Sequence, residues 1–242
     1  MLLDHSAYGT KHEYYLTQNG QEVVKSMYKG GKLTYLKGYL STRVKYHGRK
    51  NIKTSAKFAF VGLGLMGSRV VDVIAQLKNQ EGKPFYPTLA INTNIQDLDS
   101  IENCQNKLPL SGFERGAGRD PAIGLKAIKA NEEEVKTRFR QVAEGQDMVF
   151  IVAGLGGGTG TGSVLQITQW ASQIREYFGI KFGLILSLPR KRDKVIENQN
   201  ALSILSKLNN LVAERKIPTI IIDNEHLYSD YKEKREKGTI EV

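Results

Sequence analysis

The part of the chain best suited to chemistry is a run of small residues at 154–163, which reads GLGGGTGTGS. Glycine lets the backbone approach a ligand closely, and the interleaved threonine hydroxyls add hydrogen-bond donors. The run follows an apolar stretch at 148–153, so it stands where a strand would lead into a helix whose N-terminus attracts anions. No Lys-Ser or Lys-Thr pair follows the last glycine, so this is not a Walker loop. We therefore predict a loop that binds phosphates through backbone dipoles and a metal ion.

A second glycine motif, GLGLMG at 62–67, also follows an apolar stretch and matches the pattern GxGxxG. Its first interpretation is the dinucleotide-binding turn of an NAD(P)-dependent dehydrogenase. That class uses an acidic residue at the end of the second strand to hold the ribose hydroxyls. Asn92, Thr93 and Asn94 occupy that place here, which disfavours the dehydrogenase but keeps it as the alternative enzyme class.

Four segments together resemble the tubulin/FtsZ superfamily of GTPases. GGGTGTG at 156–162 is similar to the signature loop of that family, and ERGAGRDPAIG at 114–124 is similar to the loop over the terminal phosphate. INTN at 91–94 and LGLMG at 63–67 are similar to two further nucleotide loops. In order and spacing, residues 51–231 most resemble the tubulin-like GTPases of bacterial plasmid and phage partition systems.

The resemblance implies that the chain binds GTP or GDP, with Mg²⁺ held through the phosphates and no metal ligand from the protein. Residues 65–67 and 156–162 would contact the phosphates, and residues 116–119 would cover the terminal one. Pro189 and Glu197 would contact the ribose. Asn224 would read the guanine edge, although a plain turn residue is its simpler interpretation. The full set is Leu65, Met66, Gly67, Thr93, Asn94, Gly116, Ala117, Gly118, Arg119, Gly156, Gly157, Gly158, Thr159, Gly160, Thr161, Gly162, Pro189, Glu197 and Asn224.

No catalytic residue is assigned in this chain. In the resembled family, an acidic loop after a long central helix completes hydrolysis in the neighbouring subunit. The acids after Asp223 instead fall in a short charged segment, at Glu225, Asp230, Glu233, Glu236 and Glu241. We therefore expect the C-terminal activation domain to be absent and GTP turnover by this chain alone to be negligible. The resemblance also implies two partners, other copies in a head-to-tail filament and a partition adaptor bound to centromeric DNA.

The elements that must position these loops form a regular series from residue 57 onward. Apolar β-rich runs alternate with helical periodicity, which predicts an α/β fold with a doubly wound, mostly parallel sheet and helices on both faces. The predicted strands are 57–61, 87–92, 107–110, 148–153, 181–187 and 218–223. Four apolar stripes predict one helix each: Val70, Val73, Ile74 and Leu77; Ile128, Val135, Phe139 and Val142; Val164, Ile167, Ala171, Ile174 and Phe178; Leu202, Leu205, Leu208 and Val212. Residues 232–242 are predicted to be a charged, frayed tail.

The N-terminal segment has a different composition from the rest of the chain. The formal net charge is +10, and most of the excess of Lys and Arg falls before residue 57. We therefore place a basic extension at 1–50, ahead of a nucleotide-binding domain at 51–231. A strand at 12–16 and a helix capped at Thr17 resemble the wing and following helix of a winged-helix adaptor. A solvated basic arm, a winged-helix remnant and a DNA-binding element with weak nucleic-acid contacts all remain open.

Cysteine content and apolar run lengths exclude several other classes. Cys104 is the only cysteine, so the chain has neither a cystine framework nor a cluster of thiols for zinc. The longest apolar runs, such as 58–67, are too short to span a membrane. We therefore expect a cytoplasmic protein with no membrane partner.

Overall fold

The computed structural model describes residues 3–8, 11–16, 56–79 and 81–236, and it divides into two compact units, Met1–Ser55 and Ala56–Val242. In the first unit, β1 (Leu3–Tyr8) and β2 (Lys11–Leu16) form an antiparallel hairpin. Strand β2 includes the strand predicted at 12–16. The helix predicted from Thr17 lies outside the described residues, so the winged-helix resemblance stays a prediction.

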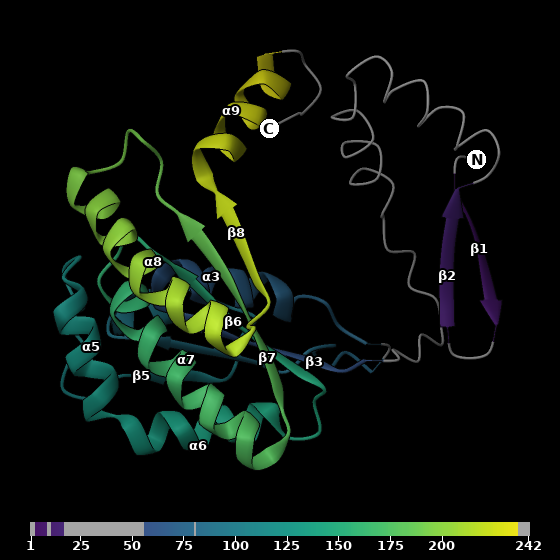
Figure 1. Ribbon diagram of the computed structural model, residues 1–242, viewed down its shortest axis with the longest axis horizontal. Helices are drawn as coiled ribbons and strands as arrows, with labels where there is room; N and C mark the ends of the chain where they lie inside the picture. The colour runs from purple at the N-terminus through teal and green to yellow at the C-terminus, as the bar shows by residue number, and fades with distance from the viewer. Residues whose placement is uncertain (1–2, 9–10, 17–55, 80, 237–242) are drawn as a thin grey trace. The chain divides into compact units, whose positions relative to one another are not determined.

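The second unit is built on a six-stranded sheet in the order β5-β4-β3-β6-β7-β8, in which every neighbouring pair is parallel (Figure 1). Its strands are β3 (Phe58–Leu63), β4 (Thr88–Asn92), β5 (Lys107–Pro109), β6 (Met148–Gly154), β7 (Lys181–Leu188) and β8 (Thr219–Asp223). Every residue of β4 is buried, as expected for a parallel strand covered on both faces. The predicted α/β fold with a parallel sheet is confirmed.

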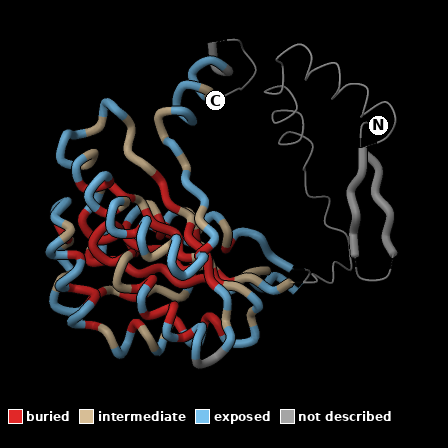
Figure 2. Tube along the Cα trace, in the orientation of Figure 1, coloured by how far each residue is buried: buried red, intermediate tan, exposed pale blue. Residues whose placement is uncertain are grey.

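Helices cover both faces of this sheet. On one face, α3 (Gly64–Ala75) and α4 (Ile95–Asp99) enclose a small apolar cluster. On the other face, a larger cluster joins α5 (Pro121–Ala130), α6 (Glu132–Ala143), α7 (Thr159–Phe178) and α8 (Val195–Arg215). Figure 2 shows buried residues concentrated along the strands and the helix faces against them. Helix α9 (Asn224–Glu236) follows β8 and projects beyond its end. No helix in the described part of the chain is long and apolar enough to cross a membrane.

The apolar stripes predicted for α7 and α3 can be compared with the burial of the same residues in the structure. In α7, the predicted stripe is correct at every residue whose burial is described, from Val164 to Ile174. In α3 the predicted stripe is wrong at Val73, which is 60% exposed, and at Leu77, which follows the helix and is 50% exposed, whereas Val70 packs against the smaller cluster. The buried face of α3 instead consists largely of small residues: Gly64, Gly67, Ser68, Val71 and Ala75. Small side chains let this helix lie close to the sheet, and a hydrophobicity pattern does not register them.

The helix predicted around residues 128–142 is two helices. Asn131 separates α5 from α6, and its side chain explains the break. Its amide nitrogen donates to the backbone oxygens of Ser111 (3.1 Å) and Ala127 (2.9 Å), and its amide oxygen accepts from the Ser111 nitrogen (3.0 Å). Asparagine can satisfy backbone groups in this way in place of the next helical turn.

Two further predictions need correction near the end of the described chain. In α8, Leu202 is 70% exposed, and its neighbours Ala201 and Ile204 are buried in its place. Within the tail predicted at 232–242, the described residues up to Glu236 are helical and belong to α9. The carboxylate of Asp223 begins this helix by accepting from the backbone nitrogen of Glu225 (2.9 Å).

Candidate functional site

A cavity of about 820 Å³ lies at the carboxyl ends of the strands. From β3 the chain moves outward to β4 and β5 on one side, and it returns to β6, β7 and β8 on the other. The strand order therefore reverses between β3 and β6, and ligands of open α/β sheets bind at such a switch point. Both glycine motifs follow these two central strands. The cavity has the size of a small-molecule site.

Two helices begin at this cavity without a side-chain cap. Helix α3 starts at Gly64 and α7 starts at Thr159, and neither N-cap residue makes a side-chain hydrogen bond to the first turn. Their first-turn N–H groups and the positive ends of their dipoles are therefore available to an anion. Helix α5 differs, because the Asp120 carboxylate accepts from the Ala122 nitrogen at 2.8 Å. The arrangement suits a phosphate chain that contacts the N-termini of both α3 and α7.

The two glycine motifs are in direct contact. A Cβ placed on Gly64 would lie 2.8 Å from the nitrogen of Gly160, and Gly64 also has a positive φ of 68°. Either feature alone favours glycine at this position. Beside this contact, the Thr93 and Thr159 hydroxyls are 2.6 Å apart, which ties the end of β4 to the start of α7. The walls of the cavity are thus locked to each other by backbone contact and a buried hydrogen bond.

A seam between α5 and α7 brings a third segment to the cavity. A Cβ on Gly124 would lie 2.4 Å from the oxygen of Gly158, and one on Gly162 would lie 2.1 Å from the oxygen of Pro121. The two helices therefore touch through their backbones. This contact places the loop at 116–120, which precedes α5, against the glycine loop at 154–158.

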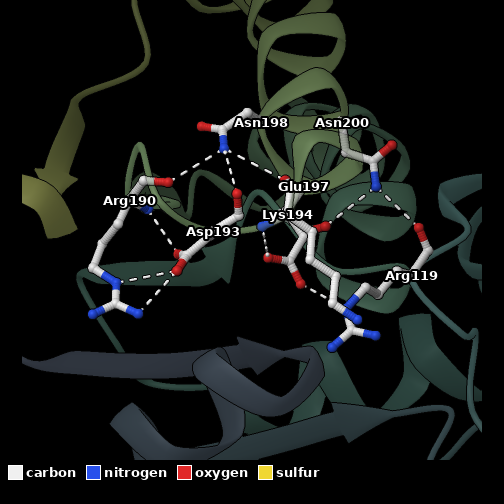
Figure 3. Close-up of polar contacts among 8 residues, drawn as sticks. Arg119, Arg190, Asp193, Lys194, Glu197, Asn198 and Asn200 are labelled. Carbon is white, nitrogen blue, oxygen red and sulfur yellow. Dashed lines mark hydrogen bonds and ion pairs between the residues drawn. The ribbon is translucent and has the colours of Figure 1, made fainter.

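The 116–120 loop has an unusual backbone and is held from α8. Gly116, Gly118 and Arg119 all have positive φ angles, of 92°, 56° and 66°. The Nε of Arg119 donates to Oε1 of Glu197 at 2.6 Å (Figure 3). The Nδ2 of Asn200 donates to the backbone oxygens of Arg119 (2.9 Å) and Gly156 (3.2 Å). The first turns of α8 therefore hold both loops.

The turn before α8 is ordered by a second ion pair. Arg190 contacts Asp193 at 3.0 Å, and Asn198 donates to backbone oxygens of this turn (Figure 3). The pKa of Asp193 is lowered chiefly by the hydrogen bond from the Arg190 backbone, with further help from the guanidinium. The side-chain hydrogen bond with Asp193 in turn raises the pKa of Arg190. Asp193 lines the cavity as a carboxylate.

Most of the predicted GTP-contacting residues line this cavity: Leu65, Met66, Thr93, Asn94, Gly116, Ala117, Gly118, Arg119, Gly156, Gly157, Gly158, Thr159, Gly160, Pro189, Glu197 and Asn224. Gly67, Thr161 and Gly162 do not line it and are buried behind the wall. A Cβ on Gly67 would lie 2.4 Å from the oxygen of Val152. The Thr161 hydroxyl donates to the Gly154 oxygen at 3.5 Å. These three residues support the packing of the loops.

Four charged residues that line the cavity are outside the predicted set, namely Arg69, Asp97, Arg115 and Asp193. Three of them stand beside or within a motif: Arg69 two residues after GLGLMG, Asp97 three after Asn94, and Arg115 inside ERGAGRDPAIG. Proximity to a motif was therefore the available signal. Asp97 accepts from the Asn92 side chain at 3.1 Å, which joins α4 to the end of β4.

Comparison with known proteins gives several matches to one family. Residues 57–232 match the GTPase domain of the tubulin/FtsZ family. The tubulin-like protein TubZ of Bacillus cereus is 38% identical over 187 residues, which cover 74% of this chain and 41% of the relative. Cell division protein FtsZ 1 of Methanocaldococcus jannaschii is 34% identical over 180 residues, covering 73% of this chain and 44% of the relative.

Solved structures agree on the fold. The GTPγS-form protofilament of Bacillus thuringiensis serovar israelensis TubZ has a TM-score of 0.62 and 24% identity, covering 75% of this chain and 51% of that one. The chain spans less than half the length of the curated relatives named above. On the match of residues 57–232, the chain belongs to the tubulin/FtsZ family and contains its GTPase domain.

Proposed function

We propose that this chain binds GTP and GDP at the cavity, as the nucleotide-binding part of a filament-forming GTPase of plasmid partition. One observation carries the proposal. The first turns of α3 and α7 open without side-chain caps onto a glycine-lined cavity at the switch point of a tubulin/FtsZ-family sheet. The names of relatives support the remainder, since TubZ is called tubulin-like and one TubZ structure is a GTPγS-form protofilament.

Each wall of the cavity has a proposed role. Residues 156–160 and the first turn of α7 bind the α and β phosphates through backbone N–H groups. Residues 116–119 cover the terminal phosphate. Pro189 and Glu197 contact the ribose. Asn224, the first residue of α9, presents an amide that can donate to and accept from the guanine edge.

The residues present fit a Mg²⁺ ion that arrives with the phosphates. The described residues contain no cluster of three or more His, Cys, Asp or Glu side chains that could hold a metal alone. Mg²⁺ commonly needs only one or two carboxylates beside phosphate oxygens. Asp193 and Glu197 are engaged by arginines, whereas no ion pair within the described residues engages Asp97. The sequence assigned no metal ligand from the protein; among the lining carboxylates, Asp97 would be the one left to bind an ion whose other ligands are phosphate oxygens, and the ion would neutralise phosphate charge.

Self-association and adaptor binding are proposed from the family resemblance. We propose head-to-tail association with further copies and binding to a partition adaptor on centromeric DNA, in the cytoplasm. We also keep the division into a basic extension at 1–50, a nucleotide-binding domain at 51–231 and a charged segment at 232–242. No lining residue in the described part of the chain is assigned to activating water, so nucleotide binding is the activity proposed for residues 56–236.

The dehydrogenase and the DNA-binding adaptor find no support. Asn92, Thr93 and Asn94 stand at the end of β4, where a dehydrogenase would place an acid for the ribose. The adaptor was suggested by residues 1–50, of which the structure describes the strands at 3–8 and 11–16, whereas residues 17–50 lie outside the described part of the chain.

Thermal unfolding with ligands tests the proposed function. GTP and GDP with Mg²⁺ should raise the unfolding midpoint with a dependence on ligand concentration, and ATP and NAD should not. Asn224→Ala should abolish the preference for GTP over ATP, whereas Asn210→Ala, at an exposed position on α8, should preserve it. Stabilisation by NAD alone, or by all of these nucleotides equally, would contradict guanine-nucleotide binding.

A further inference from the structure

We propose that Asn200 is a positioning residue that fixes the 116–120 loop against the glycine loop and thereby sets the preference for a triphosphate over a diphosphate. The inference rests on the proposed function, because it assumes that the cavity binds guanine nucleotides. Asn200 belongs to none of the motifs in the sequence, and it does not line the cavity. It acts from α8, through the backbone of the two loops (Figure 3).

The hydrogen bonds of Asn200 are the first line of evidence. Its side chain is buried, with 9% of the residue exposed. The two hydrogens of its amide group meet two carbonyl oxygens from different loops, those of Arg119 at 2.9 Å and Gly156 at 3.2 Å. One rigid group therefore sets the distance between the loop assigned to the terminal phosphate and the loop assigned to the other phosphates.

The backbone of Arg119 is the second line of evidence. A non-glycine residue with a φ of 66° is uncommon and costs free energy unless its surroundings hold it there. Among the described residues, Lys216 at the end of α8 is the other non-glycine example. Arg119 is held at both ends, at its carbonyl by Asn200 and at its guanidinium by Glu197. A strained residue fixed in this way indicates a loop whose conformation matters for binding.

The two loops differ in how they are otherwise anchored. The glycine loop is tied to the sheet, because the Leu155 nitrogen donates to the Ser187 oxygen at 2.9 Å. The 116–120 loop makes backbone hydrogen bonds within its own region, such as that from Asp120 to Ala117 at 2.8 Å. Losing Asn200 should therefore displace the 116–120 loop more than the glycine loop. A diphosphate, which does not reach the 116–120 loop, should then be affected less than a triphosphate.

Titration calorimetry with GTPγS and GDP in the presence of Mg²⁺ tests the inference in the full chain. Asn200→Ala and the isosteric Asn200→Asp should each lower the ratio of GTPγS to GDP affinity by about fivefold, the net effect of a hydrogen bond. Asn198→Ala is the matched control. That amide lies on the same helix but bonds to the 190–194 turn, so the ratio should stay at the wild-type value.

A double-mutant cycle shows whether Asn200 acts through the loop of Arg119. Arg119→Ala should itself lower the ratio, and adding Asn200→Ala should lower it by less than a further twofold. A purely structural role would lower the unfolding midpoint and both affinities together, with an unchanged ratio, and that result would overturn the inference. An equal fall in the ratio of GTPγS to GDP affinity in Asn198→Ala would also overturn the inference. If the wild-type chain binds neither nucleotide, the proposed function fails first and the inference with it.

Discussion

The backbone seam between α5 and α7 makes a sharp prediction for a single methyl group. In Gly162→Ala, the new Cβ would lie 2.1 Å from the oxygen of Pro121 and 2.6 Å from the nitrogen of Leu125. Both neighbours are backbone atoms of α5, so neither can rotate away. Ordinary van der Waals contact would require the two helices to separate by roughly 1 Å at the end that carries the 116–120 and glycine loops.

The expected cost follows from the overpacking of a buried contact. Inserting a methyl group that forces backbone movement costs typically about 1–3 kcal/mol, and this site lies at the upper end because backbone meets backbone. For a domain of this size, about 3 kcal/mol should lower the thermal midpoint by roughly 6–12 °C. Chemical denaturation in urea, followed by far-ultraviolet circular dichroism, measures the same free energy of unfolding.

Gly157→Ala is the matched control for this stability measurement. It is the same substitution in the same glycine-rich run, but a Cβ there meets no atom within 4 Å. Its unfolding free energy should stay within about 0.5 kcal/mol of wild type. Gly124→Ala, whose Cβ would meet the Gly158 oxygen at 2.4 Å, should behave like Gly162→Ala. If Gly162→Ala proved as stable as Gly157→Ala, the close approach of α5 and α7 would be refuted.

Three further substitutions test contacts that hold the frame, each by urea unfolding against wild type. Asn131→Ala should cost about 2 kcal/mol, because it removes the three hydrogen bonds that the buried Asn131 amide makes with the Ser111 backbone and the Ala127 oxygen; a loss below about 0.5 kcal/mol would contradict this. Thr93→Val should cost about 1 kcal/mol by removing the 2.6 Å contact with Thr159, and no loss at all would refute a structural role for it. Burial raises the pKa of Asp72, but hydrogen bonds from the Cys104 and Asn103 backbone outweigh this and lower it below 3.8. The ionised Asp72 therefore stabilises the fold fully above pH 3.8, and this stabilisation is lost as the pH falls through the lowered pKa of the folded state. The unfolding free energies of wild type and Asp72→Asn should differ at pH 7 and converge in acid. A difference that did not depend on pH would contradict this.

The strands and glycine loops were predictable because their residue types follow directly from backbone requirements. Parallel strands buried on both faces consist of continuous apolar residues, so β4 and β6 are evident in the sequence. Gly64 requires glycine because of its positive φ and its backbone contact, and Gly160 requires it because of backbone contact alone; runs of glycine rarely have another cause. Since these loops follow adjacent strands at the switch point, their convergence was predictable as well.

The faces of α3 and α8 were not predictable by the same reasoning. A hydrophobic pattern assigns Val73 and Leu202 to the core because of their size, but the close approach of α3 to the sheet selects small residues such as Gly67 and Ala75. The break at Asn131 depends on Ser111, twenty residues away in sequence, so no local pattern reveals it. Tertiary contacts decide all of these positions.

The charges that line the cavity explain why geometry dominates at this site. Three arginines (Arg69, Arg115 and Arg119) and three carboxylates (Asp97, Asp193 and Glu197) line the cavity, so the formal charges of the lining side chains cancel. A polyanionic nucleotide therefore gains little from the net charge of these side chains, and its phosphates must be held by backbone N–H groups, helix dipoles and Mg²⁺. Backbone donors are effective only when their positions are fixed. For that reason the contacts that fix them, the glycine seam between α5 and α7 and the amide of Asn200, should influence binding more than the loss of any single lining charge.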